Sequence, residues 1–177
     1  MKKRLISLLV ALCMAVTLLP VSALTAWAEG GDQLRIVDGY PVGSGGEGWS
    51  YDGATLDLHP ASPTDYDFSK LISGRGNVLA CALKIGEKAT ITDGRFINNI
   101  TNSGTITGGV FQPLSSQSLT FENSGIITGG EFLSTLGPLY FTNNISGTIE
   151  GGIFSVSSLS NSGTINGGIF QEKPNGG

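Results

Sequence analysis

Four copies of one ten-residue phrase follow one another along the chain, and the first reads Asn102-Ser-Gly-Thr-Ile-Thr-Gly-Gly-Val-Phe111. The other three are Asn123-Ser-Gly-Ile-Ile-Thr-Gly-Gly-Glu-Phe132, Ile145-Ser-Gly-Thr-Ile-Glu-Gly-Gly-Ile-Phe154 and Asn161-Ser-Gly-Thr-Ile-Asn-Gly-Gly-Ile-Phe170. A degenerate copy, Ala89-Thr-Ile-Thr-Asp-Gly-Arg-Phe96, precedes them. Repeats at this spacing are typical of a solenoid, in which each repeat buries its apolar face only against its neighbours.

Apolar positions of the repeat align as columns. The first two columns are Ile106, Ile127, Ile149 and Ile165, and Phe111, Phe132, Phe154 and Phe170. A third, looser column precedes the Asn-Ser-Gly turn and consists of Ile100, Phe121, Phe141 and Leu159. Because apolar and small polar residues alternate, each column predicts a strand with one buried face. The chain is therefore expected to be all-β, a parallel β-helix of about four to five coils with three short strands in each.

Glycine and asparagine recur at the turns of the repeat. The Gly-Gly pairs predict tight corners and a close approach of neighbouring coils, since glycine tolerates positive φ and has no Cβ. Asn102, Asn123 and Asn161 predict a stacked ladder of side-chain amides. In the third copy Ile145 takes the place of asparagine and Asn144 lies one residue early, which predicts a break in the ladder there.

The repeats differ in length. The isoleucine column advances by 15 residues from Ile91 and then by 21, 22 and 16 residues. The extra residues fall in 112–119, 133–139 and 155–158, so loops of changing length are expected on one side. Such insertions are where a solenoid often presents a binding face. Loops that are merely tolerated are the alternative interpretation.

The first 28 residues have the pattern of a secretory signal peptide, expected as a helix, with Ala26-Trp27-Ala28 before the cleavage site. Their apolar run, 5–19, is shorter than the about 20 residues that cross a bilayer, so no stable membrane span is expected after cleavage. Cleavage would remove three of the 10 basic residues and none of the 14 acidic ones, which leaves a formal charge of −7. The protein is therefore expected to be secreted or at the cell surface, and its acidity argues against a nucleic-acid partner.

The rest of the chain divides by composition. Residues 29–82 are expected to form an N-terminal β-rich cap over the first coil, with a hairpin from Trp49 to Leu58 that turns at Asp52 and Gly53. Residues 83–170 carry the β-helix repeats, and 171–177 are expected to form a flexible tail.

One segment of the cap also carries a resemblance. Gly48-Trp-Ser-Tyr-Asp-Gly-Ala-Thr-Leu-Asp-Leu58, followed by Gly-Thr-Ile-x-Gly-Gly-x-Phe repeats, resembles secreted and cell-surface proteins of gut Firmicutes. Those proteins are thought to be parallel β-helices and are often labelled carbohydrate-binding or adhesin-like. The similarity covers residues 48–170, although Thr55-Leu-Asp-Leu58 departs from the family's Thr-Leu-Thr-Leu. It implies the β-helix fold, an extracellular location and carbohydrate recognition.

Exposed aromatic rings are the usual readers of sugars, and the candidates are Trp49, Tyr51 and Tyr140. By the two-residue period of a strand, Trp49 and Tyr51 point to the same side. The alternative for Trp49 is a hydrophobic plug that seals the first coil.

Calcium is the one cofactor that the sequence suggests. Asp65 and Asp67 place two carboxylates on one side of an extended segment, and calcium takes several oxygen ligands. A solvated acidic loop is the alternative, and no other cofactor is expected.

No catalytic constellation emerges from the sequence. The single histidine, His59, precedes a proline, and no partner suggests a triad. Glu131 and Glu150 occupy different positions in the repeat, which disfavours a glycosidase pair. Asp93 and Arg95 are the nearest approach to a polysaccharide lyase, a distant alternative.

The resulting hypothesis is a secreted, non-enzymatic interaction module that binds polysaccharide or acts as an adhesin-like surface protein. The competing hypothesis is a structural solenoid, or a piece of one, that associates end to end with other copies.

Overall fold

The computed structural model describes residues 33–74, 77–115 and 117–172. Two units, Met1–Gln33 and Leu34–Gly177, make up the chain, and the description below concerns the second. The predicted signal peptide and the last five residues of the predicted tail lie outside the described residues.

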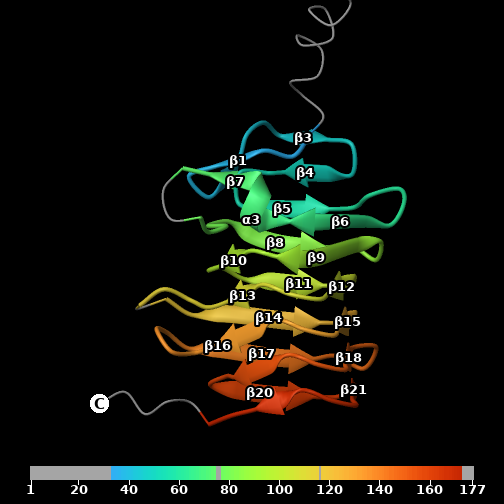
Figure 1. Ribbon diagram of the computed structural model, residues 1–177, viewed down its shortest axis with the longest axis vertical. Coiled ribbons are helices and arrows are strands. Elements are labelled where there is room, and N and C mark those ends of the chain that lie inside the picture. Colours follow the sequence, from blue (N-terminus) through green and yellow to red (C-terminus); the bar gives the residue numbers. More distant parts are fainter. Residues whose placement is uncertain (1–32, 75–76, 116, 173–177) are drawn as a thin grey trace, which may run out of the picture. The chain divides into compact units, whose positions relative to one another are not determined.

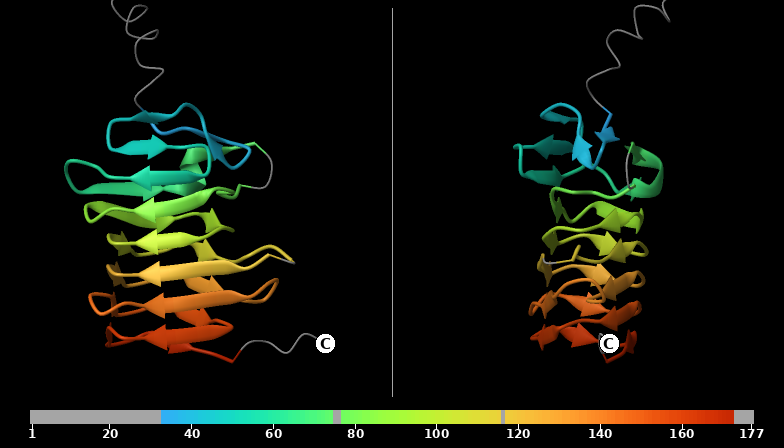
Figure 2. Two further views of the ribbon diagram at one scale, coloured as in Figure 1. Left: turned by 180° about the vertical axis from the view of Figure 1, so that it is seen from behind. Right: turned by 90° about the vertical axis from the view of Figure 1, so that its left-hand side faces the viewer.

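Three parallel stacks of strands form the body of this unit (Figures 1 and 2). The stack called the first face contains β5 (Thr55–Leu58), β8 (Ala82–Ile85), β11 (Ile100–Asn102), β14 (Leu119–Asn123), β17 (Leu139–Asn143) and β20 (Ser158–Asn161). The second face contains β6 (Thr64–Asp67), β9 (Ala89–Asp93), β12 (Thr105–Ile106), β15 (Ile126–Ile127), β18 (Thr148–Ile149) and β21 (Thr164–Ile165). The third face contains β10 (Arg95–Phe96), β13 (Val110–Phe111), β16 (Glu131–Leu133), β19 (Ile153–Ser155) and β22 (Ile169–Phe170).

The chain visits the three faces in turn, one strand on each, before it starts the next coil. In one such coil β14, β15 and β16 follow one another, and each pairs in parallel with its equivalent in the next coil, β17, β18 and β19. This all-β arrangement of stacked parallel sheets is that of a solenoid, as the repeats predicted.

The register of the pairing places equivalent repeat positions directly above one another. Ile106 pairs with Ile127, and Phe111 pairs with Phe132. Phe121 of the third column pairs with Phe141. The three predicted columns are therefore confirmed, and their side chains fill the interior.

The N-terminal segment adds a hairpin and a small sheet. β4 (Trp49–Tyr51) pairs antiparallel with β5, which confirms the predicted hairpin, and β3 (Gly45–Gly46) pairs with β4. β1 (Ile36–Val37) lies between β2 (Tyr40–Pro41) and β7 (Ile72–Ser73) in a separate sheet. Because β5 and β6 already pair in parallel with β8 and β9, regular coiling begins before residue 83.

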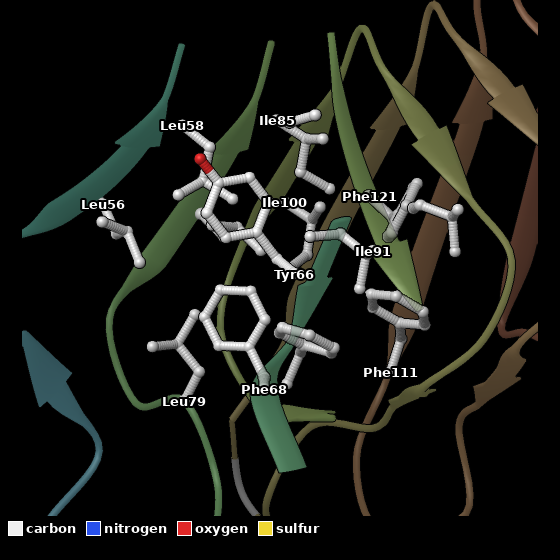
Figure 3. Packing of buried hydrophobic residues seen from close by; sticks show 14 of the residues in the cluster. Leu56, Leu58, Tyr66, Phe68, Leu79, Ile85, Ile91, Ile100, Phe111 and Phe121 are labelled. Carbon is white, nitrogen blue, oxygen red and sulfur yellow. The ribbon is translucent and has the colours of Figure 1, made fainter. Parts of the chain in front are cut away.

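Phenylalanine rings organise the core. Phe111 and Phe132 stack with ring centroids 4.7 Å apart, close to the spacing between strands, and Phe132 and Phe154 stack at 4.6 Å. Phe121 of the third column meets Phe132 edge to face, with an angle of 88° between the rings. Both arrangements are favourable for aromatic pairs. At the N-terminal end Phe68, the first residue of α3 (Phe68–Leu71), covers this column by an edge contact with Phe96 (Figure 3).

A buried asparagine ladder runs beside this apolar core. The Nδ2 atom of Asn102 donates to Oδ1 of Asn123 over 2.7 Å, and Asn123 donates in the same way to Asn143 over 2.8 Å. Asn143 then donates to Asn161 over 2.7 Å. The predicted break at Asn144 is wrong. Asn143, the residue before it, pairs with Asn123 in the ladder, and Asn144 bonds instead to the hydroxyl of Ser124.

The glycine pairs form the corner between the second and third faces, and their two members have different tasks. A Cβ at Gly151 would lie 2.1 Å from the carbonyl oxygen of Thr128 in the previous coil, so the first glycine permits close stacking. Gly152 has φ +100°, a conformation that side chains rarely adopt, so the second glycine permits the turn.

Candidate functional site

A groove of about 610 Å³ runs along the corner between the second and third faces. Its floor consists of the glycine pairs of successive coils, where the missing side chains leave a depression. Its volume lies within the range of ligand sites. The groove differs from an ordinary cleft because its floor is backbone and because it repeats once per coil.

The residue that follows each glycine pair lines the groove on the third face. In successive coils it is Val110, Glu131, Ile153 and Ile169, which pair with one another in register. Their neighbours Phe111, Phe132 and Phe154 point inward and are buried, so the alternation of the strand turns these side chains outward. The wall is therefore apolar, with one carboxylate in it.

The sequence contains a signal for this wall that our sequence reasoning missed. In the phrase Gly-Gly-x-Phe the x position varies among Val, Glu and Ile while its neighbours are constant. An outward position next to an invariant turn is free to vary, because no core packing restricts it.

The groove is acidic. Asp93 and Glu131 are the charged residues that line it, and the chain has no lysine or arginine between residues 101 and 170. Asp93 lies at the N-terminal end, in register with Gly108, the first glycine of a pair. Its Oδ1 atom accepts a hydrogen bond from the backbone N–H of Gly94 over 2.7 Å.

The predicted sugar-binding aromatics lie away from this groove and differ in exposure. Trp49 is 2% exposed and belongs to the core, so its position corresponds to the alternative of a plug and leaves no open face for a sugar. Tyr51 is half-buried against the core, and its hydroxyl donates to the carbonyl of Gly53. Tyr140 is 47% exposed on the outer side of the first face, in register with Thr120 and Ser158. Of the three, only Tyr140 can stack on a ligand without rearrangement.

The loops of varying length lie at another corner, between the third and first faces. The segment around Gly137 packs on the preceding loop, since a Cβ there would lie 2.7 Å from the carbonyl oxygen of Leu114. Gln112 donates to the hydroxyl of Thr135, which joins the same two loops. The predicted loop side and the groove are therefore different surfaces.

The two predicted calcium ligands lie on β6 and point outward on either side of the buried Tyr66. Asp67 has other partners: it caps α3 through the backbone N–H of Ser69 and forms an ion pair with Lys70 over 2.7 Å. Hydrogen bonds from Lys70 and Ser69 lower the pKa of Asp67. Within the described residues no group of three His, Cys, Asp or Glu side chains could hold a metal ion.

The acidic residues considered for catalysis do not form a pair. Glu131 lies on the third face and lines the groove, whereas Glu150 follows β18 of the second face. Asp93 and Arg95 lie at the N-terminal end of the same corner, both exposed. The geometry thus offers carboxylates along a groove but no two opposed ones.

The chain was compared with known proteins at this point. No protein-family model, no curated protein and no solved structure matches it. In the part of the chain that the structure describes, no helix is long and apolar enough to span a membrane.

Proposed function

We propose that the protein is a secreted, non-enzymatic parallel β-helix that binds polysaccharide at the cell surface or outside the cell, in an adhesin-like role. The observation that carries the proposal is the groove along the glycine corner. It is long and open, and it crosses successive coils, as a site for a polymer requires. The signal-peptide pattern and the resemblance to secreted Firmicutes proteins support the location.

A glycan array tests the proposal, with the folded protein applied once with calcium and once with a chelator. Selective retention on one class of polysaccharide is expected. Loss of retention in chelator would point to Asp65 and Asp67. A negative array with protein of confirmed fold would overturn the proposal.

A pair of matched variants places the binding on the groove. Ile153→Arg puts a long cation into the groove wall, whereas Ile126→Arg puts the same side chain on the outer, exposed side of the second face. Ile153→Arg should weaken binding by about tenfold or more, since it fills a contact position, and Ile126→Arg should leave binding nearly unchanged. Equal effects of both variants would mean that the ligand binds elsewhere, with Tyr140→Ala as the next test.

Self-association is a second candidate with an observation of its own. Phe170 in the last described coil is 44% exposed, whereas Phe154 one coil earlier is 1% exposed. Leu159 and Ile165 are exposed in the same coil. Exposed strand edges template pairing with another chain. Sedimentation over a range of concentrations would show a rising mass if copies associate through this coil, and a constant monomer mass would reject it.

A further inference from the structure

We propose that the groove selects an uncharged, linear glycan, that its sugar units follow the coils at one unit per coil, and that backbone groups of the glycine pairs hold them. This inference rests on the proposed function, since it names the class of polysaccharide and the way it is held. Three features of the groove lead to it: unused backbone groups, the spacing of the coils and the charge of the lining.

The first feature is the interrupted hydrogen-bond ladder at the glycine corner. Among the hydrogen bonds of the described residues, none uses the backbone N–H of Gly109, Gly130 or Gly152. The carbonyl groups of Gly108 and Gly129 also accept none there. These glycines are half-buried, so their polar groups face the groove or its water. Buried or ligand-covered backbone groups need a partner, and a ligand that covers this floor has to supply one.

Hydroxyl groups meet this need because each both donates and accepts a hydrogen bond. The same is true of a peptide backbone, but the spacing distinguishes the two. Coils repeat every 4.7–4.9 Å, roughly the advance of one pyranose unit in an extended glycan, whereas a peptide strand advances by about 3.3 Å per residue. A peptide along the groove would fall out of register with the glycines, and a glycan would keep it.

The wall complements the flat faces of sugars. Val110, Ile153 and Ile169 are apolar and partly or fully exposed, and they stand beside the floor at equivalent positions of their coils. Their methyl groups can cover the C–H faces of successive sugar units while the hydroxyls meet the backbone. The same half-polar, half-apolar surface suits no small ion.

Charge decides which glycan fits. Both charged residues of the lining, Asp93 and Glu131, are acidic, and no basic residue is present between residues 101 and 170 to neutralise a bound carboxylate or sulfate. Like charges placed together oppose binding. Uronate-rich and sulfated polymers are therefore excluded, and neutral ones are accepted.

The test compares a neutral polymer with its charged derivative, hydroxyethyl cellulose with carboxymethyl cellulose, and extends to neutral gluco-, xylo- and mannan oligosaccharides of increasing length. Binding by titration calorimetry should favour the neutral polymer by about tenfold or more at low salt. For the oligosaccharide that binds, affinity should rise with each sugar up to about four units and then level off, because the glycines that line the groove come from four coils.

Two charge-reversal variants localise the selectivity. Glu131→Lys should relieve the discrimination against carboxymethyl cellulose, and the control Glu122→Lys, on the exposed outer side of the first face, should not. If glycans bind but the carboxymethylated polymer binds as well as the neutral one, or affinity does not depend on length, this inference fails and the proposed function stands. If no glycan binds the folded protein, both fail.

Discussion

Asn123 and Asn143 join side chain to side chain inside the protein, with Nδ2 of Asn123 2.8 Å from Oδ1 of Asn143. Both residues are fully buried, and each Nδ2 also donates to a backbone carbonyl of its own turn, Gly125 for Asn123 and Gly147 for Asn143. The amides thus satisfy one another and the turns in one continuous network. Such a network is favourable only while every member is present, since a buried polar group without a partner is costly.

Asn123→Ala should therefore destabilise the fold more than loss of one side chain suggests. It leaves Nδ2 of Asn102 and Oδ1 of Asn143 without their ladder partner, at a cost of about 1–3 kcal/mol for each buried group. Urea unfolding measures the change. Asn144→Ala is the matched control, because Asn144 is only half-buried and bonds to Ser124, and it should cost clearly less. Equal losses would mean that the ladder contributes little.

Gly152→Val should destabilise the protein through the turn. Gly152 has φ +100°, and a Cβ would also lie 3.2 Å from the carbonyl oxygen of Gly130. Backbone strain of this kind costs of the order of 1–3 kcal/mol. Leu136→Val, in an exposed loop, should stay within about 0.5 kcal/mol. Comparable melting temperatures of the two variants would show that the corner accommodates a side chain.

Two positions of one column provide a test of core packing. Phe132→Ala removes a fully buried ring with stacked neighbours on both sides, and we expect a loss of about 3–5 kcal/mol. Phe170→Ala removes a ring that is exposed and stacks on Phe154, and should cost much less. Denaturant titrations of both variants give the difference. If the two costs were equal, Phe170 would be buried in solution, as a partner or a further coil would make it.

The thiol of Cys81 should be inert in the folded protein. Burial raises its pKa to about 11 from the ordinary 9.0, so the thiolate is scarce at neutral pH. The folded state favours the protonated form, so this contribution to stability is fully present below pH 9.0 and is lost as the pH rises through about 11. Iodoacetamide at pH 8 should label the protein only after unfolding. Rapid labelling under native conditions would show that this region opens.

Several features of the fold could be predicted from the repeat. The columns headed by Ile106 and Phe111 repeat with one buried face per strand, and parallel stacking is the arrangement that buries every column at once. The hairpin at Asp52 and Gly53 has a strong local turn signal, and it is confirmed by the pairing of β4 with β5. Local chemistry suffices for such features, because the partners are set by the period or by the turn.

The asparagine ladder shows where the sequence misleads. Counting back from Ser-Gly assigns Ile145 to the ladder position, but the structure places Asn143 there. Ile145 is exposed, in a turn that absorbs the inserted residues. Burying an amide with partners on both sides is favourable, whereas burying Ile145 there would leave Asn123 without an acceptor. Only the three-dimensional register decides between the two.

The candidate site depended on tertiary structure for a different reason. A groove exists where glycines of separate coils align, and Gly109, Gly130 and Gly152 lie more than 20 residues apart in sequence. Trp49 likewise has the composition of a sugar platform but is buried, because β5 and the core close over it. The sequence by itself determined the columns, the turns and the acidity. The stacking of coils decided which backbone groups are unpaired, which aromatic rings are exposed and where a ligand can lie, since these are properties of neighbours brought together only by folding.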